Sequence, residues 1–557
     1  MSKMKLARNI GIIGAFVTFV ISPNTNLDPI NLIKFFFLFI GAGYLIADYK
    51  RVISRFKTGT KTYHYFVIST LAFVLFQFVG LFFSGATLIS QIYGVFGRNT
   101  GFLTYLALSI LVLLVSTLEN SQQVREVIKY LLIITCFEMF YGLFQFANLD
   151  PYSWKNLYNR IIGTLGNPNF SSAFYGIVAS LIIPYLFVKS LGVRNRLIVL
   201  VGIGVLFFLT VASHSWQGTG LIMISSAIYF LTFIRSIPKI RILGYPIGLL
   251  YLGITALAVR GFQGDGPFGT YLNKPTFTIR MDYWQTAINT IQHHLLFGVG
   301  SDNFGDWFRL MRNEETVKRI GLGVTTNSTH NVALDIMANT GLFAGVLYLS
   351  VVVLILWKAL PRLWRPGTLD NAMFLPLFLG WFAYFIQSMV SINQIGVGVW
   401  GWIFQGLMAS LVLNDTNFTH KISEVTEKKK KKTEKALSAP SLLRIVVTPV
   451  FILIAVLPLY SDAKLISSLK SGDENKVYAA VTAFPLDPAR LNYATQTFSQ
   501  NKLPEISLKS AKFTVEHFPN SFDAWVLLRQ VTNNQADRDL AISNMKRLDP
   551  YFEKYSQ

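Results

Sequence analysis

The stretch that decides the fold runs from Thr326 to Trp357 and reads TNSTHNVALDIMANTGLFAGVLYLSVVVLILW. It opens with six polar residues and continues as a mostly apolar run. Residues 332–357 are long enough to cross a hydrocarbon core of ~30 Å as a helix. The polar part carries His330 at the point where a long hydrophilic loop enters this run. We therefore predict a membrane span that begins just after a titratable imidazole.

Runs of this kind recur along most of the chain, and the composition agrees with them. Hydrophobic residues make up 52% of the 557 residues, charged residues make up 14%, and the mean hydropathy is +0.43. A soluble domain carries about 25% charged residues. Backbone polar groups in lipid must be satisfied within the segment, so repeated apolar runs indicate helices. We predict an all-α polytopic membrane bundle of about thirteen spans. They fall near 6–22, 29–48, 63–83, 101–118, 126–147, 168–188, 195–212, 216–234, 241–260, 332–357, 371–391, 397–414 and 442–460.

The distribution of lysine and arginine predicts the orientation of this bundle. Every second connection is basic, and the residues that make it so include Lys3, Lys5, Arg8, Lys50, Arg51, Arg55, Lys189, Arg194, Arg235, Lys239, Lys358 and Arg362. Positive residues stay on the cytoplasmic side, so the N-terminus is expected inside. With thirteen spans, the loop 261–331 and the tail after residue 460 are then expected outside. The net charge of +21 mostly reflects this bias. It does not call for nucleic acid, because no basic-aromatic binding module is visible.

Four regions follow from these spans. Residues 1–414 are expected to form the membrane domain, 415–441 a basic cytoplasmic linker, 442–460 the final transmembrane helix and 461–557 an external domain. The linker contains five consecutive lysines at 428–432, which suit either contact with anionic lipid or a solvated connection that enforces topology. The single cysteine, Cys136, lies in a predicted span, so no disulfide can form within the chain.

The tail 461–557 has a pattern of its own. Apolar residues recur there at helical spacing, and Pro488, Pro519 and Pro550 are 31 residues apart twice. Proline at helix boundaries with aromatic and alanine faces between resembles tetratricopeptide-type helical hairpins. A small generic helical domain is the alternative. Hairpins of this type usually bind a partner, so the tail is a candidate protein-binding part.

Polar residues gather in the connections that face the predicted outer side. Arg98 lies in the connection 84–100, Arg160 in 148–170 and His214 in 213–219. The fourth connection is the loop 261–331, which is too long to be a mere connector and is more often functional. Its segment 276–295 has helical spacing and holds Arg280 and Trp284, while Gly298-Val299-Gly300 lacks any strand context and is a turn.

Each candidate has a plainer alternative. Arg280 could anchor an interfacial helix by snorkelling, and His330 could simply stand at a helix start. Ser328 or Thr329 is expected to cap the helix that follows. Glu138, inside a span, is costly in lipid and should face the bundle interior. His293 and His294 lack further ligands at metal spacing, so we expect no zinc site.

Taken together, these motifs resemble the bacterial O-antigen ligase and polymerase superfamily of lipid-linked glycan transferases. The resemblance covers roughly residues 90–410. It rests on Gly97-Arg98-Asn99-Thr100-Gly101, on Gly163-Thr164-Leu165-Gly166-Asn167-Pro168-Asn169, on Arg280 with Trp284, on Gly298-Val299-Gly300 before Asn303-Phe304, and on His330-Asn331 before Gly341 and Gly345. Their order and their shared placement on one face are specific.

The resemblance implies a GT-C-like membrane enzyme of the bacterial plasma (inner) membrane that acts in cell-surface polysaccharide or lipopolysaccharide assembly. It would transfer a glycan from undecaprenyl pyrophosphate to an acceptor hydroxyl on the outer face, with inversion and without metal or other cofactor. By position, Arg280 would hold the pyrophosphate and His330 would act as base or orient the acceptor. Lower-ranked candidates for binding pyrophosphate or glycan are Arg98, Arg160, His214, Trp284 and Asn331.

The chain departs from the family in two places. Members often carry Ser-Arg-Gly where this chain has Ser213-His214-Ser215, and His214 could replace that arginine only when protonated. The usual proline before the Gly-x-Gly turn is also missing. The acceptor could be a sugar, a lipid or a protein, so ligation, polymerisation and protein O-glycosylation all remain open. Two hypotheses belong to other functional classes. The protein could be a flippase or transporter for lipid-linked glycan, or a membrane scaffold whose functional domain is the tail.

Overall fold

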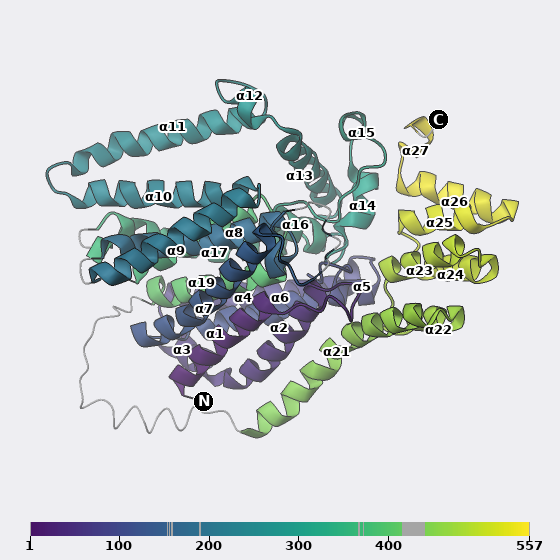
Figure 1. Cartoon of the computed structure of the whole chain (residues 1–557), viewed down its shortest axis with the longest axis horizontal. Helices are drawn as coiled ribbons and strands as arrows, with labels where there is room; N and C mark the ends of the chain where they lie inside the picture. Colours follow the sequence, from purple (N-terminus) through teal and green to yellow (C-terminus); the bar gives the residue numbers. More distant parts are fainter. Residues whose placement is uncertain are drawn as a thin grey trace.

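The protein is a helical bundle that extends at one end into a smaller group of helices (Figure 1). The computed structural model describes residues 2–152, 154, 156, 160–188, 191–365, 368–370, 373–414 and 441–555. Every regular element among these residues is an α-helix or a short 3₁₀ helix. The prediction of an all-α protein is thereby confirmed. The predicted linker 415–441 falls, except for its last residue, outside the described residues.

Ten described helices are long and apolar enough to cross a membrane, so the protein is a multi-pass membrane protein. Two further apolar helices, α6 (Phe102–Val115) and α18 (Phe374–Ser388), are shorter, as is α1 (Lys3–Phe19) at the start of the chain. Each of the thirteen predicted spans overlaps one of these helices, and ten of them are long and apolar enough to cross a membrane. The ten long helices are α2 (Asn31–Leu45) with η1 (Ile46–Asp48), α4 (Lys61–Phe83), α7 (Ser121–Phe146), α8 (Pro168–Ile182) with η3 (Ile183–Phe187), α9 (Val193–Ala212), α10 (Trp216–Ser236), η4 (Arg241–Leu243) with α11 (Gly244–Phe262), α17 (Leu342–Leu363), α19 (Ile395–Val412) and α21 (Ser441–Ser471).

One predicted span has a wrong boundary, and one predicted span lies within a longer helix. The span 332–357 is broken at Gly341 into α16 (Val332–Thr340) and α17. Gly341 has φ of 91°, and a Cβ there would lie 1.9 Å from the carbonyl oxygen of Leu296, so only glycine fits this close approach. The last span was expected to end at residue 460, but α21 continues to Ser471. A helix keeps its backbone hydrogen bonds after its side chains turn polar, so hydropathy does not mark its end.

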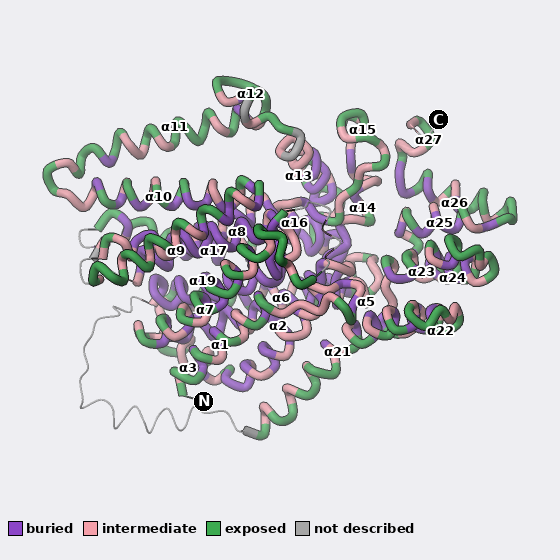
Figure 2. The backbone as a smooth tube through the Cα atoms, in the orientation of Figure 1, coloured by how far each residue is buried: buried purple, intermediate pink, exposed green. Residues whose placement is uncertain are grey.

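The bundle has a buried centre and a lipid-compatible outside (Figure 2). Every residue of α19 is buried, and α19 packs against α1, α6 and α18. In contrast, α9 and α11 expose most of their large apolar side chains, and α21 exposes many of them. Exposed apolar surface of this extent suits a hydrocarbon environment. Glu138 in α7 is fully buried and accepts hydrogen bonds from the backbone and hydroxyl of Thr164, so its predicted inward orientation is confirmed.

The long loop 261–331 is itself folded at one end of the bundle. It contains α12 (Gly269–Leu272), α13 (Pro275–His293), α14 (Phe304–Met311) and α15 (Glu314–Ile320), and α13 confirms the helix predicted near 276–295. The Gly298-Val299-Gly300 turn is also confirmed: its backbone N–H groups donate to the last carbonyls of α16 at 3.0 and 2.8 Å. The short α3 (Lys50–Thr58) lies near the other end of the bundle, and α5 (Leu88–Tyr93) lies near the folded loop (Figure 1).

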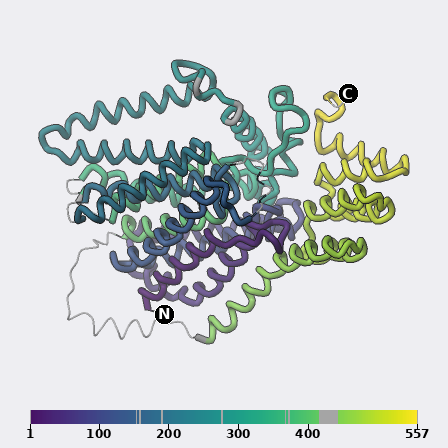
Figure 3. Tube along the Cα trace, in the orientation of Figure 1, coloured from purple at the N-terminus to yellow at the C-terminus, as the bar shows by residue number. Residues whose placement is uncertain are grey.

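The tail forms a second group of helices beyond the same end of the bundle (Figure 3). Its helices are α22 (Glu474–Val481), α23 (Pro488–Gln500), α24 (Pro504–His517), α25 (Phe522–Val531), α26 (Gln535–Leu548) and α27 (Phe552–Tyr555). Successive helices pack on one another through connections of a few residues. Pro488 opens α23, while Pro519 and Pro550 lie in the connections, as the 31-residue spacing suggests. The tetratricopeptide assignment stays a prediction.

The tail is docked on the folded loop. Asp549 accepts hydrogen bonds from Arg312 at 2.6 Å and from Arg309 at 3.4 Å, and the side chains of Arg312 and Asp549 are fully buried. Glu314 accepts from Lys554 and Tyr555 at 2.8 and 2.7 Å. These ion pairs join two parts of the chain that are more than 200 residues apart in sequence.

Candidate functional site

The fold brings Arg280 and His330 together. Arg280, Tyr283 and Trp284 lie on α13, and His330 stands just before α16, which packs on α13. The ring of Tyr283 lies 5.3 Å from the imidazole of His330, centroid to centroid. His330 adopts the left-handed backbone region with φ of 54°, which is uncommon for residues other than glycine. Uncommon backbone conformations of this kind concentrate at functional sites.

The imidazole of His330 is held in the neutral form. Burial, and then the positive charge of Arg280, lower the pKa of His330 to about 4. Its Nδ1 lies 3.3 Å from the carbonyl oxygen of Ser328. A carbonyl can only accept, so this contact places the proton on Nδ1 and leaves the lone pair of Nε2 available. The imidazole is therefore arranged as a proton acceptor.

Next to it, α13 presents two donor side chains, Arg280 and Trp284. Arg280 is partly buried and forms no ion pair within the described part of the chain; its guanidinium lies 5.8 Å from the ring of Phe277. Burial lowers the pKa of Arg280, which shows the cost of leaving this cation uncompensated. Trp284 lies one turn later, and its Nε1 is buried with no hydrogen-bond partner among the described residues. A partly buried arginine without an ion pair, one turn from a buried indole N–H that lacks a partner among the described residues, marks a place for an anion.

The segment that carries His330 is positioned by a buried ion-pair network. The guanidinium of Arg98 lies 3.0 Å from Asp302 and 3.0 Å from Asp335. Asp335 in turn accepts from the hydroxyl of Ser328 and from the backbone N–H of Thr329, both at 3.0 Å. Arg98 is 5% exposed and Asp335 is 5% exposed. The network therefore ties the connection before α6, the Gly-x-Gly turn region and the first turn of α16 to the backbone beside His330.

This network changes two expectations, the phosphate-binding role of Arg98 and the capping of α16 by Ser328 or Thr329. Arg98 was a candidate for phosphate binding, but two carboxylates already compensate its charge, and a phosphate would have to displace them. We assign it a positioning role.

The expectation that Ser328 or Thr329 caps α16 is wrong, because Asn331 is the cap and accepts from the N–H of Leu334 at 3.1 Å. Asp335 engages Ser328 and the backbone of Thr329 instead, and Asn331 is thus occupied with the helix end.

The remaining candidates lie further out. His214 is exposed and has φ of 53°, in a connection that Ser215 fastens to Asn169 at the start of α8 with a hydrogen bond of 2.8 Å. The next residue, Trp216, lies 5.8 Å from the ammonium of Lys274, just before α13. This contact places the 213–219 connection near the helix that carries Arg280. Arg160 is exposed, and among the described residues its side chain does not contact the other candidates.

Sequence reasoning missed the residues that hold the site in place. Asp282 is buried and accepts from Arg319 and from the hydroxyl of Thr316, which fastens α13 to α15. Asp302 accepts from the N–H groups of Val95 and Thr100 at 2.9 and 3.2 Å. The sequence offered a signal only for Asp335, which stands inside an otherwise apolar stretch, because a buried carboxylate requires donors. Asp282 and Asp302 stand among polar residues and gave no such signal.

Comparison with known families agrees with this placement. Residues 170–349 match the family model described as O-Antigen ligase. No curated protein matches the chain. The matched region contains Arg280, Trp284, His330 and Asn331 but excludes Arg98 and the tail. The motifs' resemblance to the O-antigen ligase superfamily is confirmed, and the protein is a multi-pass membrane protein with an O-antigen ligase domain and a glycan ligase- or polymerase-like role.

Proposed function

We propose that this protein transfers a glycan from undecaprenyl pyrophosphate to an acceptor hydroxyl on the outer face of the bacterial plasma membrane. The observation that carries the proposal is the position of two donors beside a neutral imidazole at His330: Arg280, which forms no ion pair among the described residues, and Trp284, whose buried Nε1 lacks a partner there. Donors of this kind suit a pyrophosphate leaving group, and a neutral imidazole suits an attacking hydroxyl. The O-antigen ligase match over the same residues supports it.

The reaction we propose is a single displacement. Nε2 of His330 takes the proton of the acceptor hydroxyl while its oxygen attacks the anomeric carbon of the donor sugar. The bond from that carbon to the pyrophosphate oxygen breaks on the opposite side, so the configuration inverts. Arg280 and Trp284 donate to the pyrophosphate as its negative charge grows. Donors that strengthen with developing charge typically contribute about 10²–10³ in rate.

The donor itself would improve the base. Burial, and then the positive charge of Arg280, give His330 a pKa of about 4. A bound pyrophosphate compensates that charge and adds negative charge beside the imidazole, and opposite charge nearby favours the protonated form. The pKa of His330 should therefore rise on donor binding. The base becomes effective only when the leaving group is in place, which discourages loss of the glycan to water.

The acceptor class stays open within this proposal. A sugar, a lipid and a protein hydroxyl would all fit the same displacement, so ligation, polymerisation and protein glycosylation are variants of one reaction. A transporter for lipid-linked glycan is the alternative from another class. Translocation of an intact lipid requires groups that bind the pyrophosphate but no base beside them. Because His330 stands beside Arg280 and Trp284, we favour transfer.

Sealed vesicles containing the purified protein and radiolabelled undecaprenyl-pyrophosphate-linked glycan separate these functions. Added membrane extract supplies acceptors. We expect release of undecaprenyl pyrophosphate together with label in a new product that is no longer lipid-pyrophosphate-linked. Movement of intact labelled lipid across the vesicle without cleavage would instead establish transport and refute the proposal.

A further inference from the structure

A polar cavity of about 160 Å³ lies where the tail meets the folded loop. Three separate parts of the chain build its wall: the connection before α6, the folded loop with α14, and the start of α25. The residues on which the argument depends are Asp306, Arg309, Thr325, Asn327, Phe522 and Asp523. A docking contact held by buried ion pairs would be expected to close over its whole area, so a retained cavity calls for an explanation.

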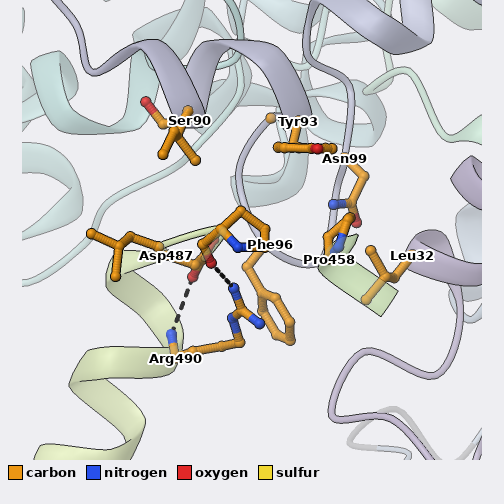
Figure 4. Close-up of a pocket in the computed structure, with 12 residues that line it drawn as sticks. Leu32, Ser90, Tyr93, Phe96, Asn99, Pro458, Asp487 and Arg490 are labelled. Carbon is orange, nitrogen blue, oxygen red and sulfur yellow. Dashed lines mark hydrogen bonds between the residues drawn. The ribbon is translucent and has the colours of Figure 1, made fainter. Parts of the chain in front are cut away.

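The other contact between the tail and the bundle end shows what closure looks like. There Asp487 and Arg490 at the start of α23 face Tyr93 and Asn99 (Figure 4). The space left between them is only about 20 Å³. Arg490 is buried, and its guanidinium donates to the carbonyl of Pro485 and to the hydroxyl of Ser461 at 2.6 Å. The tail therefore packs tightly at one contact and leaves room at the other.

The lining of the larger cavity favours a neutral ligand rich in hydroxyl groups. Desolvation, and then the negative charge of Asp523, raise the pKa of Asp306 to about 7, so the two carboxyl groups lie close to each other. The cation present, Arg309, already pairs with Asp549 and lies 4.2 Å from the ring of Phe522. An anion would thus meet uncompensated repulsion, whereas hydroxyl groups can donate to both carboxylates and bond to the threonine and amide groups. Within the described residues no third histidine, cysteine or carboxylate joins the pair to make a cation site.

The cavity is also connected to the candidate active site. The carbonyl of Asn327, on the cavity wall, accepts a hydrogen bond from Arg98, the centre of the network that positions His330. Asn327 and His330 are three residues apart, a distance of at most roughly 10 Å even in extended chain. A ligand in the cavity could therefore belong to the same glycan chain that reacts at His330.

We propose that this cavity binds one neutral sugar residue of the glycan, near the reacting end. The proposal rests on the proposed function for its biological sense, since the sugar would be carried by either the donor or the acceptor. In both cases the tail contributes one wall of the sugar site, and Asp523 is its specificity-determining carboxylate.

Binding can be measured without turnover on the full-length protein in detergent. The probes are neutral methyl glycosides of glucose, galactose, mannose and their 2-acetamido forms, detected by saturation-transfer-difference NMR. The His330→Ala variant serves as the host, so chemistry plays no part. At least one glycoside should bind, and Asp523→Asn should weaken that binding at least tenfold, because a hydrogen bond to a charged group is lost. Thr325→Trp, which fills the cavity, should abolish it.

The matched control is Glu505→Gln, which removes the same charge from the first turn of α24 away from the cavity and should bind like the host. Equal binding by host, Asp523→Asn and Thr325→Trp, or no glycoside binding at all, would overturn the proposal. So would displacement of the signal by Ca²⁺ or by a serine-containing peptide at lower concentration than any glycoside. These binding results do not depend on the outcome of the transfer assay. The sugar site and the proposed function can therefore be refuted independently.

With transfer running, the two sources of the sugar also separate. A rise in KM for the lipid-linked donor in Asp523→Asn assigns the cavity to the donor glycan, and a rise in KM for the acceptor assigns it to the acceptor. In either case kcat should change little, because Asp523 does not touch the reacting atoms. An unchanged KM for both substrates would contradict the proposal.

Discussion

Replacement of Asp335 tests whether the buried network positions the base. Its carboxylate receives three hydrogen bonds at 3.0 Å, from Arg98, from the Ser328 hydroxyl and from the Thr329 backbone. Asp335→Ala removes all three and leaves Arg98, 5% exposed, with Asp302 as its remaining counter-charge. Breaking one partner of a buried ion pair typically costs about 3–5 kcal/mol. We therefore expect a fall of several degrees in the thermal unfolding midpoint.

The catalytic effect should exceed that of lost stability alone. Without Asp335, the Thr329 N–H and the Ser328 hydroxyl lose their acceptor, and this segment keeps only local hydrogen bonds such as those between Ser328 and Thr326. A displacement of the base by about 1 Å can cost roughly 10² in rate. Asp335→Asn keeps one acceptor for that backbone but loses the charge that faces Arg98. Its transfer rate should lie between those of the parent and Asp335→Ala.

The assays are thermal unfolding in detergent by intrinsic fluorescence and glycan transfer at a temperature where every variant is folded. Glu315→Ala, an exposed acidic residue of the same folded loop, is the control and should match the parent in both assays. If Asp335→Ala melts and transfers like Glu315→Ala, the network does not position His330.

Three further predictions concern pH, docking and topology. The value of kcat/KM for the donor should stay level from pH 7 down to about 5 and fall only toward pH 4. The reason is that the base must be neutral and the pKa of His330 is lowered to about 4. A fall in kcat/KM near pH 6.5 would contradict the environment described for this imidazole. Asp549→Ala should loosen the tail, since it strands a fully buried arginine at a cost of about 3–5 kcal/mol; hydrogen exchange at α14 and α26 should rise at least tenfold, and no change would show that the ion pairs do not hold the tail. Single cysteines in 265–325 and 470–550 should react with an impermeant thiol reagent in intact cells, because the basic connections predict an outer location; labelling of the tail only after permeabilisation would reverse that topology.

Local patterns in the sequence were sufficient for much of the fold. Apolar runs located all thirteen helical regions, since burial in lipid demands both length and hydropathy from a contiguous segment. Helical spacing located α13, and paired glycines located the 298–300 turn. The break at Gly341 was invisible because its cause is the Leu296 carbonyl, a tertiary neighbour 45 residues away.

For the site, the reactive residues could be predicted from the sequence, but the residues that position them could not. Arg280 and His330 could be paired because both stand in one outer loop of the predicted topology. The partners of Arg98 could not be predicted, since Asp302 and Asp335 lie more than 200 residues away in sequence and only the fold brings them together. The cap of α16 was misassigned for a related reason, because Asp335 engages the serine and the backbone that local rules would have given to the helix end.

The most direct test of the central claim is the initial rate of undecaprenyl pyrophosphate release in vesicles, compared for the parent, Arg280→Ala and His330→Ala at equal amounts of inserted protein. Both variants should be slower by about 10²–10³ or more, because each loses a group that acts on the reacting bond. Arg280→Lys should recover only part of the rate, since a single ammonium cannot reproduce a guanidinium fork. His293→Ala, on the same helix as Arg280 and exposed, should match the parent. Release at the parental rate by both alanine variants would show that Arg280 and His330 do not form the active site.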